Sequence, residues 1–542
     1  KDLCIKSESF KADLILTPEL SLLGYPPKDL LLKPYIKNLQ KKALQDISKT
    51  IQDKAPKISI LVGIAESTGD GYSPPLFNST ALINKNGWEI VARKQLLPTY
   101  DVFDEKRYFR SGESSNVLYF KTSNRVTKIG ITICEDLWVE ESLQSQRTTG
   151  PDPIEKLIPE SIDFLVNLSA SPFSKTKHES RILIAQKAST RLKCPVVYLN
   201  QIGGNDELIF DGSSFVLNDA SETILELKSC EEDIKAWDTN TLESKSSLDK
   251  KIPEEELFKA LVLGVKDYAK KCGFNSSIIG LSGGIDSALV AIIAAAAFGR
   301  EKVTSLLMPS PWSSTHSVKD ALELSNRIGS KTLTLPIDNL MEVFSATLEL
   351  PLESIPKGIT AENLQSRIRG ILLMAFSNAQ NHLLLSTGNK SELAVGYCTL
   401  YGDMNGGLSV IGDLYKTEVF RLCEWIDSPS AENCRILMGL PETGDLIGKN
   451  IRQKSPSAEL RPGQFDTDSL PNYTLLDSIL QRIIEDQKHP DELIREGFDS
   501  EVITQVIGLM KKGEFKRYQA PPLLKVSEQS FGSGWRLPIA AK

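Results

Sequence analysis

The sequence predicts an α/β protein of two domains, and three observations support that prediction. At 542 residues the chain is too long for one ordinary hydrophobic core. Up to about residue 230, apolar runs of strand length recur with turns between them, and only two helical stretches interrupt them. From residue 254 onward, predicted helices alternate with predicted strands, the pattern of a doubly wound parallel sheet.

Changes in this pattern give the expected boundaries. Residues 1–228 form the strand-rich domain, with helices predicted near 34–54 and 178–192. Residues 229–253 are polar and charged without periodicity, so we predict a linker there. Residues 254–542 form the second domain, and its tail after about residue 455 is predicted to be mostly loops and helices.

The beginning of the sequence, KDLCIKSESFKADLIL, is predicted to be a helix remnant before a strand. It has no initiator Met, so we expect the natural N-terminus to lie further upstream.

Composition narrows the classes of partner. The net charge of −7 predicts no basic face, so we expect no nucleic-acid partner. No run of about 18 apolar residues and no signal peptide is visible, which predicts a cytoplasmic protein without a membrane partner. The eight cysteines are scattered without a C-x-x-C pair. This argues against a disulfide framework or a zinc site and for a reducing compartment.

The segment GLSGGIDS, residues 280–287, joins an apolar strand to an alanine-rich helix. Open α/β sheets bind ligands at the carboxyl ends of their strands, where this segment lies. Its glycine pair lets the backbone approach an anion, and its serines and the helix N–H groups can donate hydrogen bonds to that anion. It is not a Walker A loop, because it ends Asp-Ser. A carboxylate in a phosphate loop needs a cation beside it, so we interpret Asp286 as a Mg²⁺ ligand. A helix cap in a glycine turn is the alternative.

Because Ser282 to Ser287 read S-G-G-x-D-S, this segment resembles the loop of the pyrophosphatase-loop ATPases. Members of that superfamily cleave ATP between its α and β phosphates, adenylate a substrate oxygen and release pyrophosphate. The resemblance implies ATP binding by Gly280, Leu281, Ser282, Gly283, Gly284, Ile285, Asp286 and Ser287. It does not name the substrate.

Three predicted strands of the first domain end at reactive side chains, namely Glu19, Lys94 and Cys134. If the strands belong to one sheet, the three groups meet at one edge. A general base, a thiol nucleophile and a cation that favours the thiolate and the oxyanion would then lie together. A lone Cys after an apolar run is otherwise a core residue. A Cys-His pair is less attractive, because the chain has only four His and the nearest in sequence is His178.

The motifs PELSLLGYPP, RKQLLPTYDVFDEKRYF and GITICEDLW resemble those of the nitrilase superfamily, in its glutamine-hydrolysing branch. The resemblance implies an αββα sandwich in which Glu19 is the general base, Lys94 stabilises the tetrahedral intermediate and Cys134 forms a γ-glutamyl thioester. It also implies that Glu105 supports Lys94. The implied glutamine contacts are Tyr100, Ser171 and Lys177. The superfamily's first strand and the turn after it have no counterpart in this sequence.

A glutaminase joined to an adenylating domain suggests one reaction, in which ammonia from glutamine attacks an acyl-adenylate. Over essentially its whole length the chain resembles the glutamine-dependent NAD⁺ synthetases. That implies a C–N ligase that uses deamido-NAD⁺, ATP and L-glutamine, with Mg²⁺ as cofactor, an ammonia channel and a homo-oligomeric state. The implied ATP contacts are Thr387, Lys416 and Ser457; the implied deamido-NAD⁺ contacts are Asn363, Glu392 and Lys516; the implied metal ligands are Asp286 and Glu392.

The sequence patterns of other amidotransferases and of tRNA-thiolating enzymes differ from those of this chain. GMP synthetase and asparagine synthetase need a G-x-C-x-G or an N-terminal Cys nucleophile, and the chain has neither; Cys4 is predicted to lie in a helix. Enzymes that thiolate tRNA need paired cysteines and a basic surface, and this sequence predicts neither. Another pyrophosphatase-loop amidotransferase, or a non-catalytic nucleotide-binding scaffold, remains the alternative.

Overall fold

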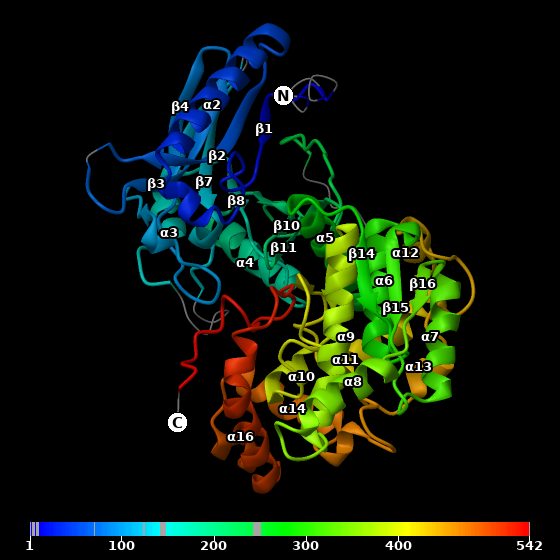
Figure 1. Cartoon of the computed structure of the whole chain (residues 1–542). Helices are drawn as coiled ribbons and strands as arrows, with labels where there is room; N and C mark the ends of the chain where they lie inside the picture. Colours follow the sequence, from blue (N-terminus) through cyan, green and yellow to red (C-terminus); the bar gives the residue numbers. More distant parts are fainter. Residues whose placement is uncertain are drawn as a thin grey trace. The chain divides into compact units, whose positions relative to one another are not determined.

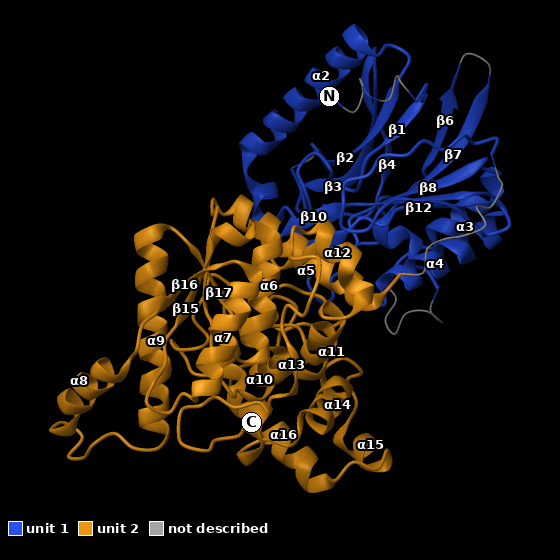
Figure 2. Ribbon diagram, turned by 90° about the vertical axis from the view of Figure 1, so that its right-hand side faces the viewer, with its two compact units in different colours: residues 1–205, 210–250 blue, residues 206–209, 251–542 orange. Residues whose placement is uncertain are grey.

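The structure is a computed structural model that describes residues 2, 6, 10–69, 71–122, 125–140, 148–241 and 251–540. Cys4, with most of the predicted helix remnant, and residues 242–250 of the predicted linker lie outside the described residues. The chain forms two compact units, one of residues 1–205 and 210–250 and one of residues 206–209 and 251–542 (Figure 2). The boundaries at 228 and 254 stay a prediction.

Two large sheets build the described part of the first unit, beside the two-stranded sheet of β10 (Ile202–Asn205) and β11 (Leu208–Asp211). The first sheet has the order β1-β2-β3-β4, and β5 also pairs with β3. Its strands are β1 (Leu14–Leu16), β2 (Ser59–Ser67), β3 (Leu76–Asn84), β4 (Gly87–Arg93) and β5 (Phe109–Arg110). The second sheet has the order β13-β12-β9-β8-β7-β6. Its strands are β6 (Val117–Lys121), β7 (Val126–Ile133), β8 (Phe164–Ser169), β9 (Val196–Asn200), β12 (Phe215–Leu217) and β13 (Thr223–Glu226).

Helices cover these sheets from outside (Figure 1). Helix α2 (Pro34–Lys54) packs on β2, β3 and β4, and α4 (Lys177–Leu192) packs on β9 and β12. Between the sheets lies an apolar core to which both contribute, with Leu61 and Leu82 from one and Ile131 and Val166 from the other. The predicted αββα sandwich and both of its predicted helices are therefore confirmed.

The expectation that three functional strands share one sheet is wrong. Glu19 and Lys94 follow strands β1 and β4 of the first sheet, whereas Cys134 follows β7 of the second. Strand β7 pairs with β6 and β8 instead of with any strand of the first sheet. The apolar runs identify strands, but a sandwich buries the same kind of strand in both layers, so they do not say which layer a strand joins.

The second unit is built on one parallel sheet of order β16-β15-β14-β17-β18. The strands are β14 (Ser277–Gly280), β15 (Val303–Leu307), β16 (Lys331–Thr334), β17 (Leu383–Ser386) and β18 (Leu408–Ser409). Helix α6 (Ile285–Phe298) packs on β14 and β15, and α9 (Ile359–Gln380) packs on β14 and β17. The chain runs outward from β14 through β15 to β16 and then returns to β17 on the other side. The carboxyl ends of β14 and β17 thus form the topological switch point, where such sheets bind ligands.

The tail consists of loops and helices, as predicted. Helices α14 (Tyr473–Ile484), α15 (Pro490–Arg495) and α16 (Ser500–Arg517) share an apolar core with the short helix α10 (Lys390–Val395). Within the described part of the chain, no helix combines the length and apolarity needed to cross a membrane.

Candidate active site

Lys94 is the centre of a buried charge network at the end of β4. Its Nζ donates hydrogen bonds of 2.7 Å to Oε1 of Glu19 and to Oε1 of Glu105, and all three residues are buried. Burial raises the pKa of Glu105 to about 7. Burial alone would lower the pKa of Lys94, but the charges of Glu105 and Glu19 hold that pKa well above its ordinary value. Lys94 is therefore a fixed ammonium between two carboxyl groups.

Sequence reasoning missed the residues that complete this network. The Tyr25 hydroxyl donates to Oε1 of Glu105 at 2.7 Å, and Nδ2 of Asn78 donates to Oε1 of Glu19 at 2.7 Å. The backbone N–H of Ala170 donates to the other Glu19 oxygen at 3.1 Å. Tyr25 stands in the quoted GYPP segment, so a signal was present, whereas nothing distinguishes Asn78 within its apolar strand.

Cys134 begins a short 3₁₀ turn (Cys134–Leu137) at the exit of β7. Its backbone φ is +48°, a left-handed conformation that costs free energy for a residue with a Cβ and is often found at functional sites. Both oxygens of the buried Asp136 tie this turn in place. Oδ1 accepts from the N–H groups of Gln95 and Leu96, both at 2.8 Å, and Oδ2 accepts from that of Ile133 at 3.1 Å. Asp136 thus connects the exits of β4 and β7, which lie in different sheets.

The Cys134 thiol has a pKa well above its ordinary value. Burial is the main cause and the Glu19 carboxylate adds to it, while Lys94 acts in the opposite direction. Burial and the nearby carboxyl groups act against the expected preference for a thiolate, which stays a prediction. A nucleophile of this kind needs a base to remove its proton as it attacks.

One predicted glutamine contact lies against the turn that begins at Cys134, and another lies against the residue that follows this turn. The Tyr100 hydroxyl donates to Oε2 of Glu135 at 3.0 Å. Nζ of Lys177 lies 4.3 Å from the ring centroid of Trp138. The third predicted contact, Ser171, is buried just beyond β8, next to the Ala170 amide that reaches Glu19.

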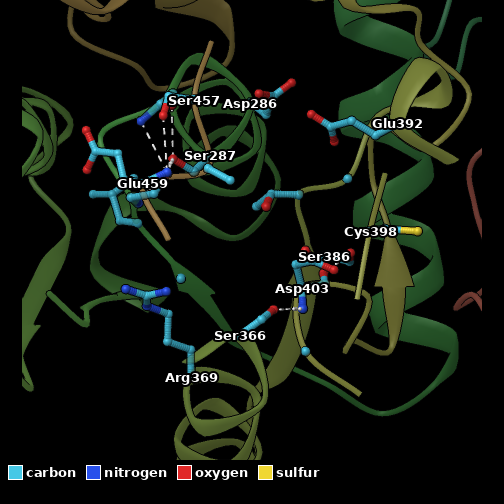
Figure 3. Close-up of a pocket in the computed structure, with 18 of the residues that line it drawn as sticks. Asp286, Ser287, Ser366, Arg369, Ser386, Glu392, Cys398, Asp403, Ser457 and Glu459 are labelled. Atoms are coloured by element: carbon cyan, nitrogen blue, oxygen red, sulfur yellow. Dashed lines mark hydrogen bonds between the residues drawn. The ribbon is translucent and has the colours of Figure 1, made fainter. Parts of the chain in front are cut away.

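In the second unit, a cavity of about 310 Å³ opens at the switch point (Figure 3). Its lining includes Glu392 and all predicted ATP residues except Gly283: Gly280, Leu281, Ser282, Gly284, Ile285, Asp286, Ser287, Thr387, Lys416 and Ser457. Residues from the ends of β14 and β17 therefore meet others from α10, α11 (Lys416–Ile426) and the segment after α13 (Lys449–Gln453).

The two glycines of the loop have different environments. Gly284 lines the cavity and is followed directly by helix α6, so the first N–H groups of that helix face the cavity. Gly283 has φ +80°, and a Cβ built there would lie 2.2 Å from the Ser317 carbonyl oxygen in α7 (Thr315–Ile328). Gly283 is thus required for close packing of the loop on α7.

Lys416 joins the two predicted metal ligands. Its Nζ donates to Oδ2 of Asp286 at 2.5 Å and to Oε1 of Glu392 at 3.4 Å. Asn389 donates to the other Asp286 oxygen at 3.0 Å. Burial raises the pKa of Glu392 to about 8. No group of three or more His, Cys, Asp or Glu side chains arranged for a metal occurs in the described residues, so two carboxylates are the donor set found here.

Asp466 is a further carboxyl group of this cavity that the sequence did not reveal. It is buried in the lining, and its Oδ2 accepts from the Tyr473 hydroxyl at 2.9 Å. Its Oδ1 has no hydrogen-bond partner among the described residues, and burial raises the pKa of the group. It begins a 3₁₀ helix of three residues (Asp466–Asp468), and so short a polar element gave no motif to recognise.

Two predicted substrate contacts lie outside the cavity lining. Oδ1 of Asn363 accepts from the Thr399 hydroxyl at 2.9 Å. Nζ of Lys516 donates to the carbonyls of Gly396 and Cys398 at 2.8 and 2.7 Å. Cys398 does line the cavity, so Lys516 supports part of the cavity wall.

Comparisons with known proteins place both halves of the chain in known families. The carbon-nitrogen hydrolase family model matches residues 4–234, and the NAD synthase model matches residues 257–520. The glutamine-dependent NAD⁺ synthetase of Synechocystis sp. is 47% identical over 99% of this chain and 94% of that protein. The enzyme of Thermotoga maritima is 37% identical over 98% of this chain and 93% of that protein.

The chain belongs to the glutamine-dependent NAD⁺ synthetase family. A solved structure of that family, from Acinetobacter baumannii in complex with ADP, matches 99% of this chain and 94% of its own at 36% identity, with a TM-score of 0.74. The resemblance to glutamine-dependent NAD⁺ synthetases stated from sequence motifs is therefore confirmed.

Proposed function

We propose that the chain makes NAD⁺ from deamido-NAD⁺, with L-glutamine as the nitrogen donor and ATP as the activating co-substrate. The observation that supports this most directly is that one chain holds two constellations. The first unit has a buried thiol near the Glu19 and Lys94 ion pair, and the second has an S-G-G-x-D-S loop in a cavity. Family membership supports the same assignment.

In the glutamine half-reaction, we assign Glu19 as the base that takes the Cys134 proton while the sulfur attacks the amide carbonyl. Lys94 stays protonated and stabilises the oxyanion, and Glu105 holds Lys94 in place. The Glu19 proton leaves with the nitrogen as ammonia, which yields a thioester on Cys134; water then releases glutamate. We assign Tyr100, Ser171 and Lys177 to glutamine binding.

In the synthetase half-reaction, a carboxylate oxygen of deamido-NAD⁺ attacks the α-phosphorus of ATP and pyrophosphate leaves. Ammonia then attacks the adenylated carboxyl carbon and AMP leaves. We assign the phosphate loop, Thr387, Lys416 and Ser457 to ATP. We assign Asn363, Glu392 and Lys516 to deamido-NAD⁺.

The residues present fit a Mg²⁺ ion held by Asp286 and Glu392. Both are carboxylates that already share one positive charge, the Lys416 ammonium, and Mg²⁺ prefers hard oxygen donors. When bound, the ion neutralises phosphate charge. Lys416 contributes a second, permanent positive charge to the same cavity.

Ammonium is not nucleophilic, so we propose that ammonia reaches the second site along a path that is shielded from water. We also propose that the chain acts as a homo-oligomer in the cytoplasm.

A paired assay tests the proposal. The purified chain receives ATP, Mg²⁺ and deamido-NAD⁺ with either glutamine or an ammonium salt, and NAD⁺ and pyrophosphate are measured. We expect both products with both donors. Absence of pyrophosphate with ammonium would contradict the synthetase half of the proposal. Formation of NAD⁺ with ammonium but not with glutamine would contradict the glutaminase half.

A further inference from the structure

Arg181, in the first half of α4, is the largest of the fully buried side chains in the described chain, and nothing above assigns it a role. All five of its N–H groups have acceptors. Nη1 donates to both carboxylate oxygens of Asp211 at 2.8 and 2.9 Å. Nη2 donates to the carbonyls of Ser171 and Pro172 at 2.8 and 2.9 Å, and Nε donates to Oγ of Ser171 at 3.1 Å.

This arrangement excludes Arg181 as a ligand of the substrate carboxylate. A guanidinium has five N–H donors, and each of them is already used. Its charge is matched by Asp211 in a buried bidentate pair, so no positive charge remains for an anion. The cation for glutamine must come from another residue, and Lys177, at the beginning of the same helix, is the one assigned to it above.

The same bonds constrain the hydroxyl group of Ser171. A serine hydroxyl has one proton to donate and two lone pairs to accept with. Nε of Arg181 donates to Oγ, so the Ser171 proton points away from Arg181. The bond to the Ser171 carbonyl fixes the backbone of the same residue. Ser171 is therefore held from two sides as a hydrogen-bond donor.

We propose that Arg181 is a positioning residue for glutamine, which orients Ser171 so that its hydroxyl donates a hydrogen bond to the substrate. The inference rests on the proposed function, because it takes Ser171 as a glutamine contact. A competing acceptor inside the protein is the Tyr198 phenol, which lies near Ser169 and Ser171. Asp211 anchors the guanidinium from the opposite side.

A double-mutant cycle tests the proposal. Wild type, Arg181→Lys, Ser171→Ala and the double variant are compared by KM and kcat for glutamine, with ammonium-supported NAD⁺ synthesis as the internal control. Each single change should raise KM about tenfold, which corresponds to about 1.4 kcal/mol, the loss of one hydrogen bond. The double variant should also show a rise of about tenfold, because Arg181 acts through Ser171. The kcat and ammonium-supported synthesis should change less than about twofold.

A rise of about a hundredfold in the double variant would overturn the proposal, since the two residues would then act independently. An Arg181→Lys variant with unchanged KM would also overturn it. Tyr198→Phe should leave KM for glutamine unchanged; a fall in KM there would show that the phenol takes the Ser171 proton in the wild type, which would overturn the proposal.

If Arg181→Lys does not fold, Asp211→Asn takes its place in the cycle. It removes one of the two acceptors of Nη1 and the carboxylate that matches the Arg181 charge, so a rise in KM with the same non-additivity is expected, and additivity would overturn the proposal. A wild-type chain that makes NAD⁺ from ammonium but not from glutamine would contradict the proposed function. An active wild type with an additive cycle would contradict only the role of Arg181.

Discussion

At the scale of single residues, the glutaminase site is governed by how many groups share one positive charge. Lys94 donates to both Glu19 and Glu105, and the Glu105 oxygen that it contacts also accepts from Tyr25. Burial and the Glu19 carboxylate raise the pKa of the Cys134 thiol, and Lys94 acts in the opposite direction. This favours a mechanism in which proton removal and attack occur together over one that begins with a stable thiolate.

Cys134→Ala should abolish glutamine-dependent NAD⁺ synthesis, because it removes the proposed nucleophile. Ammonium-supported synthesis should stay intact, because the substitution changes no residue of the second unit. Rates of NAD⁺ formation with each donor give the readout. Ser189→Ala, which changes a buried helix residue that no step of the mechanism uses, is the control variant. Loss of both activities in Cys134→Ala would instead indicate a structural role for the cysteine.

The pH dependence of alkylation tests the protonation state of Cys134. A pKa above the ordinary value means that the thiolate fraction grows only at high pH, so alkylation by iodoacetamide should keep accelerating as the pH rises past 9. The exposed Cys272 is the internal reference in the same sample, followed by mass spectrometry of the two peptides. A Cys134 rate that is already maximal near pH 7 would contradict the assignment of a protonated thiol.

Tyr25→Phe should lower the free energy of unfolding by about 2 kcal/mol, because a buried hydrogen bond to a charged group is lost. Chemical denaturation measures this. Glutamine-dependent synthesis should fall several-fold, since Glu105 holds Lys94 less firmly. Ammonium-supported synthesis should not change, and a parallel loss of both would contradict a local role for Tyr25.

At the scale of secondary structure elements, the phosphate loop depends on contact between neighbours. Gly283 allows the loop to pack on the backbone of α7, where Glu459 also binds. The Glu459 carboxylate accepts from the Ser314 N–H at 3.2 Å and from the Ser317 hydroxyl at 2.5 Å. The loop, the beginning of α7 and the segment that includes Ser457 therefore hold one another in register.

Gly283→Ala should abolish NAD⁺ synthesis with either donor. The new Cβ would clash with a backbone carbonyl at 2.2 Å, and the φ of +80° is unfavourable for Ala. Gly508→Ala, at a position in α16 with open space around it, is the matched control and should be neutral or slightly stabilising. Initial rates and thermal unfolding of both variants make the comparison. A fully active Gly283→Ala would show that the loop can move away from α7.

The elements also show how far sequence reasoning extends. Helix α2 was predicted at its observed bounds, since it is long, periodic and begins with Pro34. Strands β6 and β13 were not predicted, because they are short and partly exposed. Other features depend on contacts between distant segments, which periodicity and motifs do not encode. They are the layer that each strand joins, the hydrogen bonds that use every N–H group of Arg181, and the Asp466 oxygen that has no hydrogen-bond partner in the described chain.

At the scale of the whole molecule, a perturbation of one half-reaction should leave the other half-reaction unaffected. Removal of divalent cations with a chelator, or Asp286→Ala, should stop NAD⁺ formation with both donors, because both affect the ATP cavity. Glutamine hydrolysis in the same samples should persist, since the Lys94 network contains no group of the second unit. Glutamate release measured beside pyrophosphate separates the two. Full NAD⁺ synthesis in a chelated sample would contradict the Mg²⁺ assignment.

In the first unit, Cys134 and Glu19, the base proposed for it, follow strands of different sheets. In the described part of the chain the two sheets are not paired strand to strand; the apolar core between the layers, Asp136 and the Ala170 N–H bond to Glu19 connect them. Glutamine turnover should therefore depend on how the two layers pack on each other. A core substitution such as Val166→Ala should weaken that turnover at temperatures where the far-UV circular dichroism spectrum is still that of the folded chain.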